Sequence, residues 1–127
     1  MLRVFKERLT ESHLQELDSR WKLLLKELNN RFDSDLDVES VIFLIGLQEL
    51  GKGFRKYTKD QKLELMHIGI CTLLEPLGFY EFKGKDEDGY PHWELIEELP
   101  PLSSSQQKAM MISCILDYFG ETAIAPE

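Results

Sequence analysis

The sequence lacks most of the features that would point to catalysis. No Gly-x-Ser-x-Gly, His-Glu-x-x-His, Gly-x-Gly-x-x-Gly or P-loop pattern occurs in its 127 residues. Cysteine is also scarce, and Cys71 and Cys114 both lie among apolar neighbours. This placement is typical of reduced thiols that act as small core residues. We therefore predict no cofactor, no metal ligand and no catalytic residue.

Long apolar runs are absent as well. The longest, Val41–Leu47, is far shorter than the roughly 20 residues that a membrane-spanning helix needs. The first residues, Met1–Leu9, are charged at intervals and contain no apolar stretch of the kind found in signal peptides. These absences predict a cytoplasmic protein that does not bind membranes.

Positive charge is in deficit, with 15 Lys and Arg against 23 Asp and Glu, for a formal net charge of −8. Acidity of this size disfavours a general affinity for nucleic acid. One short segment is basic, in contrast to the rest of the chain, because five basic side chains in it are opposed only by Asp60. They are Lys52, Arg55, Lys56, Lys59 and Lys62. We name these five as candidate anion-binding residues; the ordinary alternative is a solvated loop near the negative end of the preceding helix.

Apolar residues recur at spacings of three and four, which predicts a mainly α fold, α+β at the margin, within a single domain. We expect helices at about 12–32, 37–50, 58–75 and 104–119 around a buried central helix. That central helix is 37–50, because it is apolar nearly all round. Gly46 within it is expected to allow a close helix crossing. The structure of residues 1–11 is left open, and 121–127 is expected to be a loose tail.

Capping patterns mark the predicted helix ends. At the start of each predicted helix we expect a side chain that caps the free backbone N–H groups, and after the second helix we expect a glycine with a left-handed backbone conformation. The pairs are Ser12 with Gln15, Thr58 with Gln61, and either Ser103 with Gln106 or Ser104 with Gln107; Asp37 and Gly51 serve the second helix.

A β-hairpin is predicted at about 79–96, where aromatic and polar residues alternate on both sides of Asp88-Gly89. A two-residue type I′ turn there places Lys83 opposite Glu94. The same register puts four apolar side chains on one face, where we expect them to cover the helical core. They are Tyr80, Phe82, Trp93 and Leu95.

The other hairpin face is the predicted binding surface. In this register it carries Tyr90 and His92 beside Ile96, and such residues are unusual on the free surface of a monomer. We therefore predict a non-catalytic protein–protein interaction or homo-oligomeric module that uses either this face, with Tyr90, His92 and Ile96, or the basic segment.

Two alternatives come from other functional classes. The order of elements over about 12–96 resembles winged-helix domains, which implies DNA binding through helix 58–75 and hairpin 79–96. The acidic hairpin tip, the long loop before the third helix and the overall negative charge oppose it. The third hypothesis is a metal or enzyme site near Glu64, His67 and Cys71, which share one side of helix 58–75.

Overall fold

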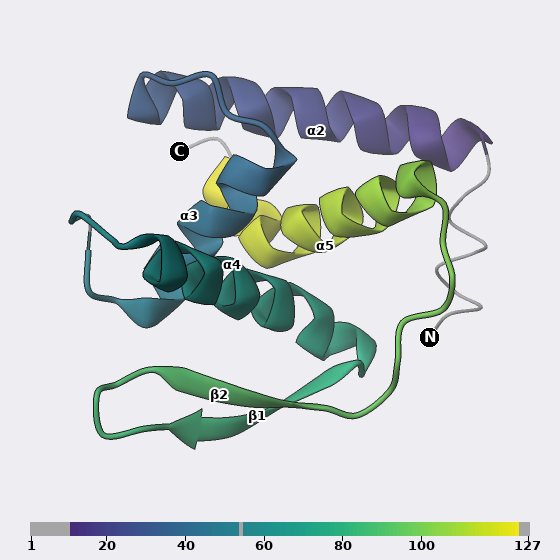
Figure 1. Ribbon diagram of the computed structural model, residues 1–127. Coiled ribbons are helices and arrows are strands. Elements are labelled where there is room, and N and C mark those ends of the chain that lie inside the picture. The colour runs from purple at the N-terminus through teal and green to yellow at the C-terminus, as the bar shows by residue number, and fades with distance from the viewer. Residues whose placement is uncertain (1–10, 54, 125–127) are drawn as a thin grey trace. The chain divides into compact units, whose positions relative to one another are not determined.

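The computed structural model describes residues 11–53 and 55–124. The elements are α2 (Glu11–Phe32), α3 (Val38–Leu50), α4 (Lys59–Leu74), the short 3₁₀ helix η1 (Glu75–Leu77), β1 (Tyr80–Lys85), β2 (Pro91–Leu95) and α5 (Ser104–Ile124) (Figure 1). The predicted mainly α fold, with a hairpin after the third helix, is confirmed.

These elements form two compact units. One contains α2 and α5, from the described parts of Met1–Val38 and Pro101–Glu127. The other is the continuous segment Glu39–Pro100, which holds nearly all of α3 together with α4, η1 and the hairpin. The assignment of the whole chain to a single domain stays a prediction.

In the first unit, α2 packs against α5. Buried side chains follow helical spacing on α2, at Trp21, Leu24 and Leu28. The helix begins at Glu11, so Ser12 lies within its first turn and is not the predicted N-cap. At α5, the Ser103 hydroxyl accepts from the Gln106 N–H at 3.2 Å, which selects the first of the two predicted caps.

The end of α5 differs from the predicted loose tail. Gly120 interrupts the helix with φ 56°, in agreement with the end predicted at 119. The backbone is nevertheless helical again as far as Ile124. Within the described residues, the tail prediction is therefore wrong for 121–124, and 125–127 lie outside them.

In the second unit, α3 and α4 cross at two glycines. A Cβ atom on Gly46 would overlap the carbonyl oxygen of Leu65, and one on Gly69 would overlap the carbonyl oxygen of Ile42. Each helix thus contributes one glycine against the backbone of the other. The close crossing predicted from Gly46 is confirmed, and Gly69 is its counterpart on α4.

The caps of α3 and α4 follow the sequence. Gly51 has φ 73° and its N–H donates to the Leu47 carbonyl at 3.0 Å, as expected of a left-handed glycine after a helix. At the start of α4, the Gln61 N–H donates to the Thr58 hydroxyl at 3.1 Å. The Thr58 N–H donates in return to the Gln61 side chain at 2.8 Å, which completes the predicted capping box.

The core of this unit joins α3, α4 and the loop between them. Its buried members are Leu47, Leu50, Tyr57, Leu65 and Ile68, with Phe43, Leu44 and Tyr90 packed against them. Tyr57 is 7% exposed, and the hydrogen-bonding requirement of its buried hydroxyl is met because the hydroxyl donates to the Gly53 carbonyl at 2.8 Å. The prediction that α3 is a buried helix is confirmed.

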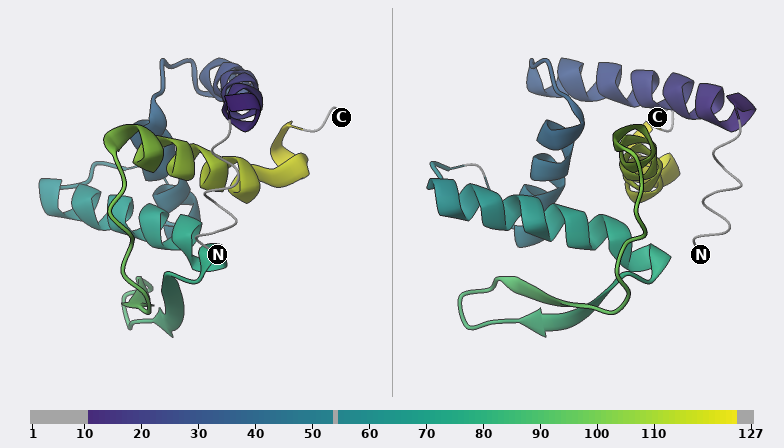
Figure 2. Two further views of the ribbon diagram at one scale, coloured as in Figure 1. Left: turned by 90° about the vertical axis from the view of Figure 1, so that its right-hand side faces the viewer. Right: turned by 45° about the vertical axis from the view of Figure 1, so that its right-hand side comes forward.

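The hairpin packs along α4, and both strands contact that helix (Figures 1 and 2). Its register differs from the predicted one by two residues, because Phe82 pairs with Trp93 and Tyr80 with Leu95. A β-bulge between Phe82 and Gly84 gives β1 one extra residue. Since the shift is even, the four apolar side chains still share one face, as predicted.

The turn explains the shift. The Gly89 N–H donates to the Asp86 carbonyl at 3.0 Å, and the strands close through the Asp86 N–H and the Tyr90 carbonyl at 2.9 Å. Only Gly89 has a positive φ in this loop, at 85°, whereas a type I′ turn would also require one at Asp88. The predicted two-residue turn is therefore wrong, and the loop is longer.

Candidate protein-interaction surface on the hairpin

The apolar face of the hairpin is only partly covered. Tyr80 is half-buried, with its ring edge-on to His67 of α4 at 6.2 Å between centroids. Phe82 is 42% exposed and Leu95 48% exposed. The expectation that this face covers the core therefore holds for Tyr80 and fails for Phe82 and Leu95, where large apolar side chains remain open to solvent.

Two residues of the segment that follows β2 extend this exposure. Ile96 is 52% exposed and Leu99 42% exposed. The hairpin and its exit segment thus carry four exposed large apolar side chains, which we call the apolar strip: Phe82, Leu95, Ile96 and Leu99. Exposed apolar side chains that form a contiguous patch are typical of interaction surfaces, whereas scattered ones are ordinary.

The opposite face of the hairpin is polar. Lys83 bridges Glu81 at 3.0 Å and Glu94 at 3.2 Å, and hydrogen bonds to these two carboxylates raise the pKa of Lys83. The predicted attraction between Lys83 and Glu94 is present, although the bulge makes Glu81 the direct cross-strand partner of Glu94. Lys83 is thus paired with carboxylates from both strands.

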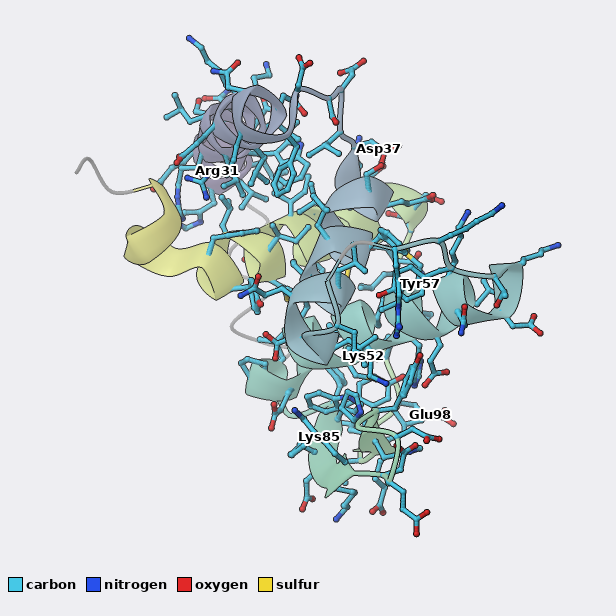
Figure 3. The ribbon with its side chains drawn as sticks, turned by 90° about the vertical axis from the view of Figure 1, so that its left-hand side faces the viewer. Arg31, Asp37, Lys52, Tyr57, Lys85 and Glu98 are labelled. Atoms are coloured by element: carbon cyan, nitrogen blue, oxygen red, sulfur yellow. The ribbon has the colours of Figure 1, made fainter. Side chains whose placement is uncertain are left out.

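Tyr90 lies away from the predicted outward position. It is half-buried, packs against the α3–α4 core, and has the Lys52 ammonium 4.5 Å from its ring centroid. Lys52 also donates to the Asp88 carbonyl at 2.6 Å. One lysine thus ties the hairpin tip to the loop after α3; Figure 3 shows Lys52 and Tyr57 there, with Lys85 marking the hairpin.

His92 and Ile96, the other two predicted partner-binding residues, are exposed. His92 Nε2 lies 2.8 Å from the Asp86 carboxylate. Asp86 also accepts from the backbone N–H groups of Tyr90 and Asp88. The hydrogen bond with His92 and those from Tyr90 and Asp88 lower the pKa of Asp86. A role for Tyr90, His92 and Ile96 in partner binding stays a prediction.

The five basic residues do not form one set. Lys52 holds the hairpin tip, and the Arg55 guanidinium lies 5.4 Å from the Tyr57 ring centroid. The remaining three, Lys56, Lys59 and Lys62, are exposed around the start of α4. Lys52 and Arg55 thus have contacts within the protein, and anion binding by the five residues stays a prediction.

Glu64, His67 and Cys71 are brought close together on α4, as their spacing predicts. The Cys71 sulfur lies 3.4 Å from His67 Nε2. Burial, and secondarily the charge of Glu64, raises the pKa of Cys71 to about 12. Among the described residues no group of three or more His, Cys, Asp or Glu has the arrangement of a metal site. The neutral thiol is a poor metal ligand and a poor nucleophile.

We therefore expect Cys71 to resist modification in the folded protein. In a Cys114→Ala variant, which leaves Cys71 as the remaining cysteine, an aromatic disulfide reagent at pH 8 should react slowly without denaturant and at once in concentrated urea. The reason is that only the thiolate reacts, and burial at 0% exposure suppresses both ionisation and access. Rapid reaction of the native variant would contradict this placement of Cys71.

The sequence alone did not identify Phe82, Leu95 and Leu99 as exposed. No signal in the sequence marks them as exposed, because alternation predicts an apolar face but not how much of that face a neighbouring helix covers. The role of Asp86 was also missed, although a short polar side chain at the start of a turn commonly accepts backbone N–H groups.

Comparisons with protein-family models, with curated protein sequences and with solved structures found no match. Over 11–53 and 55–124, no helix combines the length and the apolar character needed to cross a bilayer.

Proposed function

We propose that this protein is a non-catalytic interaction module that binds another protein through the apolar strip. The observation that carries the proposal is the exposure of Phe82, Leu95, Ile96 and Leu99 on one hairpin and its exit segment. Complete burial of such a side chain contributes about 1.5–3 kcal/mol, and roughly half of that is still to be gained at side chains that are about half exposed, so the four together would contribute several kcal/mol to an association. Buried reduced Cys71 and Cys114 support a cytoplasmic location.

The charges around the strip indicate the chemistry of the partner. Glu94, Glu97 and Glu98 are exposed and lie among the apolar residues of the strip along the chain. Figure 3 shows Glu98 beside the hairpin. A partner surface with apolar side chains flanked by Lys and Arg would complement this arrangement, because opposite charges across an interface speed association and exclude acidic competitors.

The DNA-binding alternative receives less support. The hairpin tip presents the exposed carboxylates Asp86, Glu87 and Asp88, which a winged-helix domain would have to bring near phosphates. The exposed lysines at the start of α4 are the feature that favours it. Salt-dependent DNA binding that is lost on charge reversal of Lys56 and Lys59 would support DNA binding and contradict the proposed module.

The proposal predicts that neutral changes in the strip weaken partner binding. A partner identified by affinity capture is purified, and its binding is measured by calorimetry against the wild type and a Leu95→Ser/Ile96→Ser variant. We expect an affinity at least about tenfold lower in the variant, since tenfold corresponds to roughly 1.4 kcal/mol. Serine leaves the net charge unchanged, so the loss would report apolar contact.

Matched controls are available elsewhere in the chain. Leu23 of α2 is 66% exposed and Leu63 of α4 is 62% exposed, and neither belongs to the strip. Leu23→Ser and Leu63→Ser should bind as the wild type does. The proposed surface would be refuted if the Leu95→Ser/Ile96→Ser variant (the strip variant) bound the partner as tightly as the wild type does, or if the two controls lost partner binding. A concentration-dependent dimer disrupted by the strip variant would make a second copy of the chain the partner.

A further inference from the structure

The backbone of β2 has a defined direction. The Ile96 N–H donates to the Phe79 carbonyl at 2.8 Å, and the Tyr90 carbonyl accepts from the Asp86 N–H at 2.9 Å. Residues 96 and 90 therefore point their polar groups toward β1. In a regular antiparallel strand these groups alternate between the two edges. The N–H and C=O groups of Trp93 and Leu95 consequently point to the outer edge of β2.

That edge has no third strand, because the sheet formed by the described residues contains β1 and β2 only. The two edges differ in their protection. β1 carries the bulge at Lys83 and a second lysine, Lys85, and both features discourage pairing with another chain. β2 carries only Pro91, at its first position, and then continues through Trp93 and Leu95 without a bulge.

Trp93 and Leu95, whose backbone groups point to the outer edge of β2, also carry their side chains on the apolar face of the hairpin. Leu95 belongs to the apolar strip, and Trp93 packs its ring against Phe82 at 5.1 Å between centroids. A strand placed beside β2 would set every second side chain next to Leu95 on the apolar face. The side chains between them would lie on the polar face, next to Glu94, which is exposed.

We propose that the outer edge of β2 accepts an extended segment of the partner protein as a third strand, with alternating apolar and basic side chains. This inference rests on the proposed function and specifies its mode. The N–H and C=O groups of Trp93 and Leu95 provide the main-chain hydrogen bonds. Leu95 and Phe82 receive the apolar side chains, and Glu94 favours Lys or Arg over an acidic residue.

The backbone of Leu95 allows a direct test. In Leu95→Pro the outward N–H is removed, while the inward hydrogen bonds of the hairpin are left in place, so the variant should fold. The probe is a short synthetic peptide that alternates isoleucine and lysine, and binding is followed by amide NMR spectra. We expect Leu95→Pro to bind at least about tenfold more weakly than Leu95→Ala, which loses the side chain but keeps the N–H.

Hydrogen exchange and a modified peptide add independent readouts. Exchange at the Trp93 and Leu95 amides should slow on peptide binding, while exchange at Tyr80 and Phe82 of β1 should not. Two N-methylated peptides are compared, one methylated at its isoleucines and one at its lysines; the one whose methyl groups face β2 should bind far more weakly, because alternate N–H groups of a strand point to opposite edges. An unmethylated peptide that alternates isoleucine and glutamate should bind Glu94→Lys better than the wild type. If Leu95→Pro loses the NMR signals of a folded hairpin, the binding of the two N-methylated peptides to the wild type decides the result.

The outcomes separate the mode of binding from the proposed function. Undiminished binding by both N-methylated peptides, protection at β1, or no binding of the unmodified peptide would overturn strand addition. The proposed module would still stand if the purified partner bound through the apolar strip in the Leu95→Ser/Ile96→Ser comparison. Failure of that comparison would overturn the module itself.

Discussion

Gly46→Ala is expected to destabilise the protein by about 3 kcal/mol. In a helix that is exposed to solvent, replacing glycine by alanine instead stabilises the helix by about 1 kcal/mol. The sign reverses because the added Cβ would overlap the carbonyl oxygen of Leu65, and backbone cannot move aside without separating α3 from α4. Gly69→Ala should behave similarly, since its Cβ would overlap the Ile42 carbonyl oxygen and lie 2.9 Å from Ile42 Cγ2. Urea denaturation measures both changes.

Gln48→Ala on the exposed side of α3 provides the control. The substitution raises the helix propensity at an exposed position and adds no atom against α4, so the free energy of unfolding should change by less than about 0.5 kcal/mol. If Gly46→Ala and Gly69→Ala were neutral or stabilising, the two helices would have to lie farther apart than the structure shows.

Leu65→Ala should cost about 3 kcal/mol in the free energy of unfolding, and Phe82→Ala only about 1 kcal/mol. Leu65 is 0% exposed and belongs to the α3–α4 core, so its truncation leaves a cavity. Phe82 is 42% exposed and its described ring contact is with Trp93, so water already covers much of the lost surface. Urea titrations of the two variants at one protein concentration give the comparison.

The contrast matters because the larger side chain has the smaller effect on folding. If Phe82→Ala cost as much as Leu65→Ala, the Phe82 ring would be buried in solution. A concentration series would then show whether a second copy of the chain covers it. A small effect, together with weakened partner binding by the strip variant, would place Phe82 and Leu95 at a surface that serves recognition more than stability.

Much of the fold could be predicted because its determinants are local. Thr58 with Gln61, Gly51 and the spacing of apolar residues act within one or two helical turns, so they are visible in the sequence. Gly46 was also interpretable, because a glycine inside a buried helix is costly unless a neighbour requires it. Its counterpart Gly69 is recognised only once the two helices are placed against each other.

The hairpin surface was predictable only in part. Asp88-Gly89 indicated a turn at the correct place, but three hydrogen-bonding partners of Asp86 favour a longer loop and a bulged register. Tyr90 was expected to face outward, and the longer loop instead turns its ring toward the core and Lys52. How much of Phe82 and Leu95 one helix would cover depends on tertiary packing, which alternation alone does not contain.

The division of the chain has a consequence for the order in which it folds. Glu39–Pro100 is continuous, so α3, α4 and the hairpin can form as soon as that segment leaves the ribosome. The partner of α2 is α5, which is synthesised only after the whole of that segment. During synthesis the apolar stripe of α2, with Trp21, Leu24 and Leu28, is therefore exposed until α5 has been made, and exposed apolar surface of this kind favours aggregation of a nascent chain.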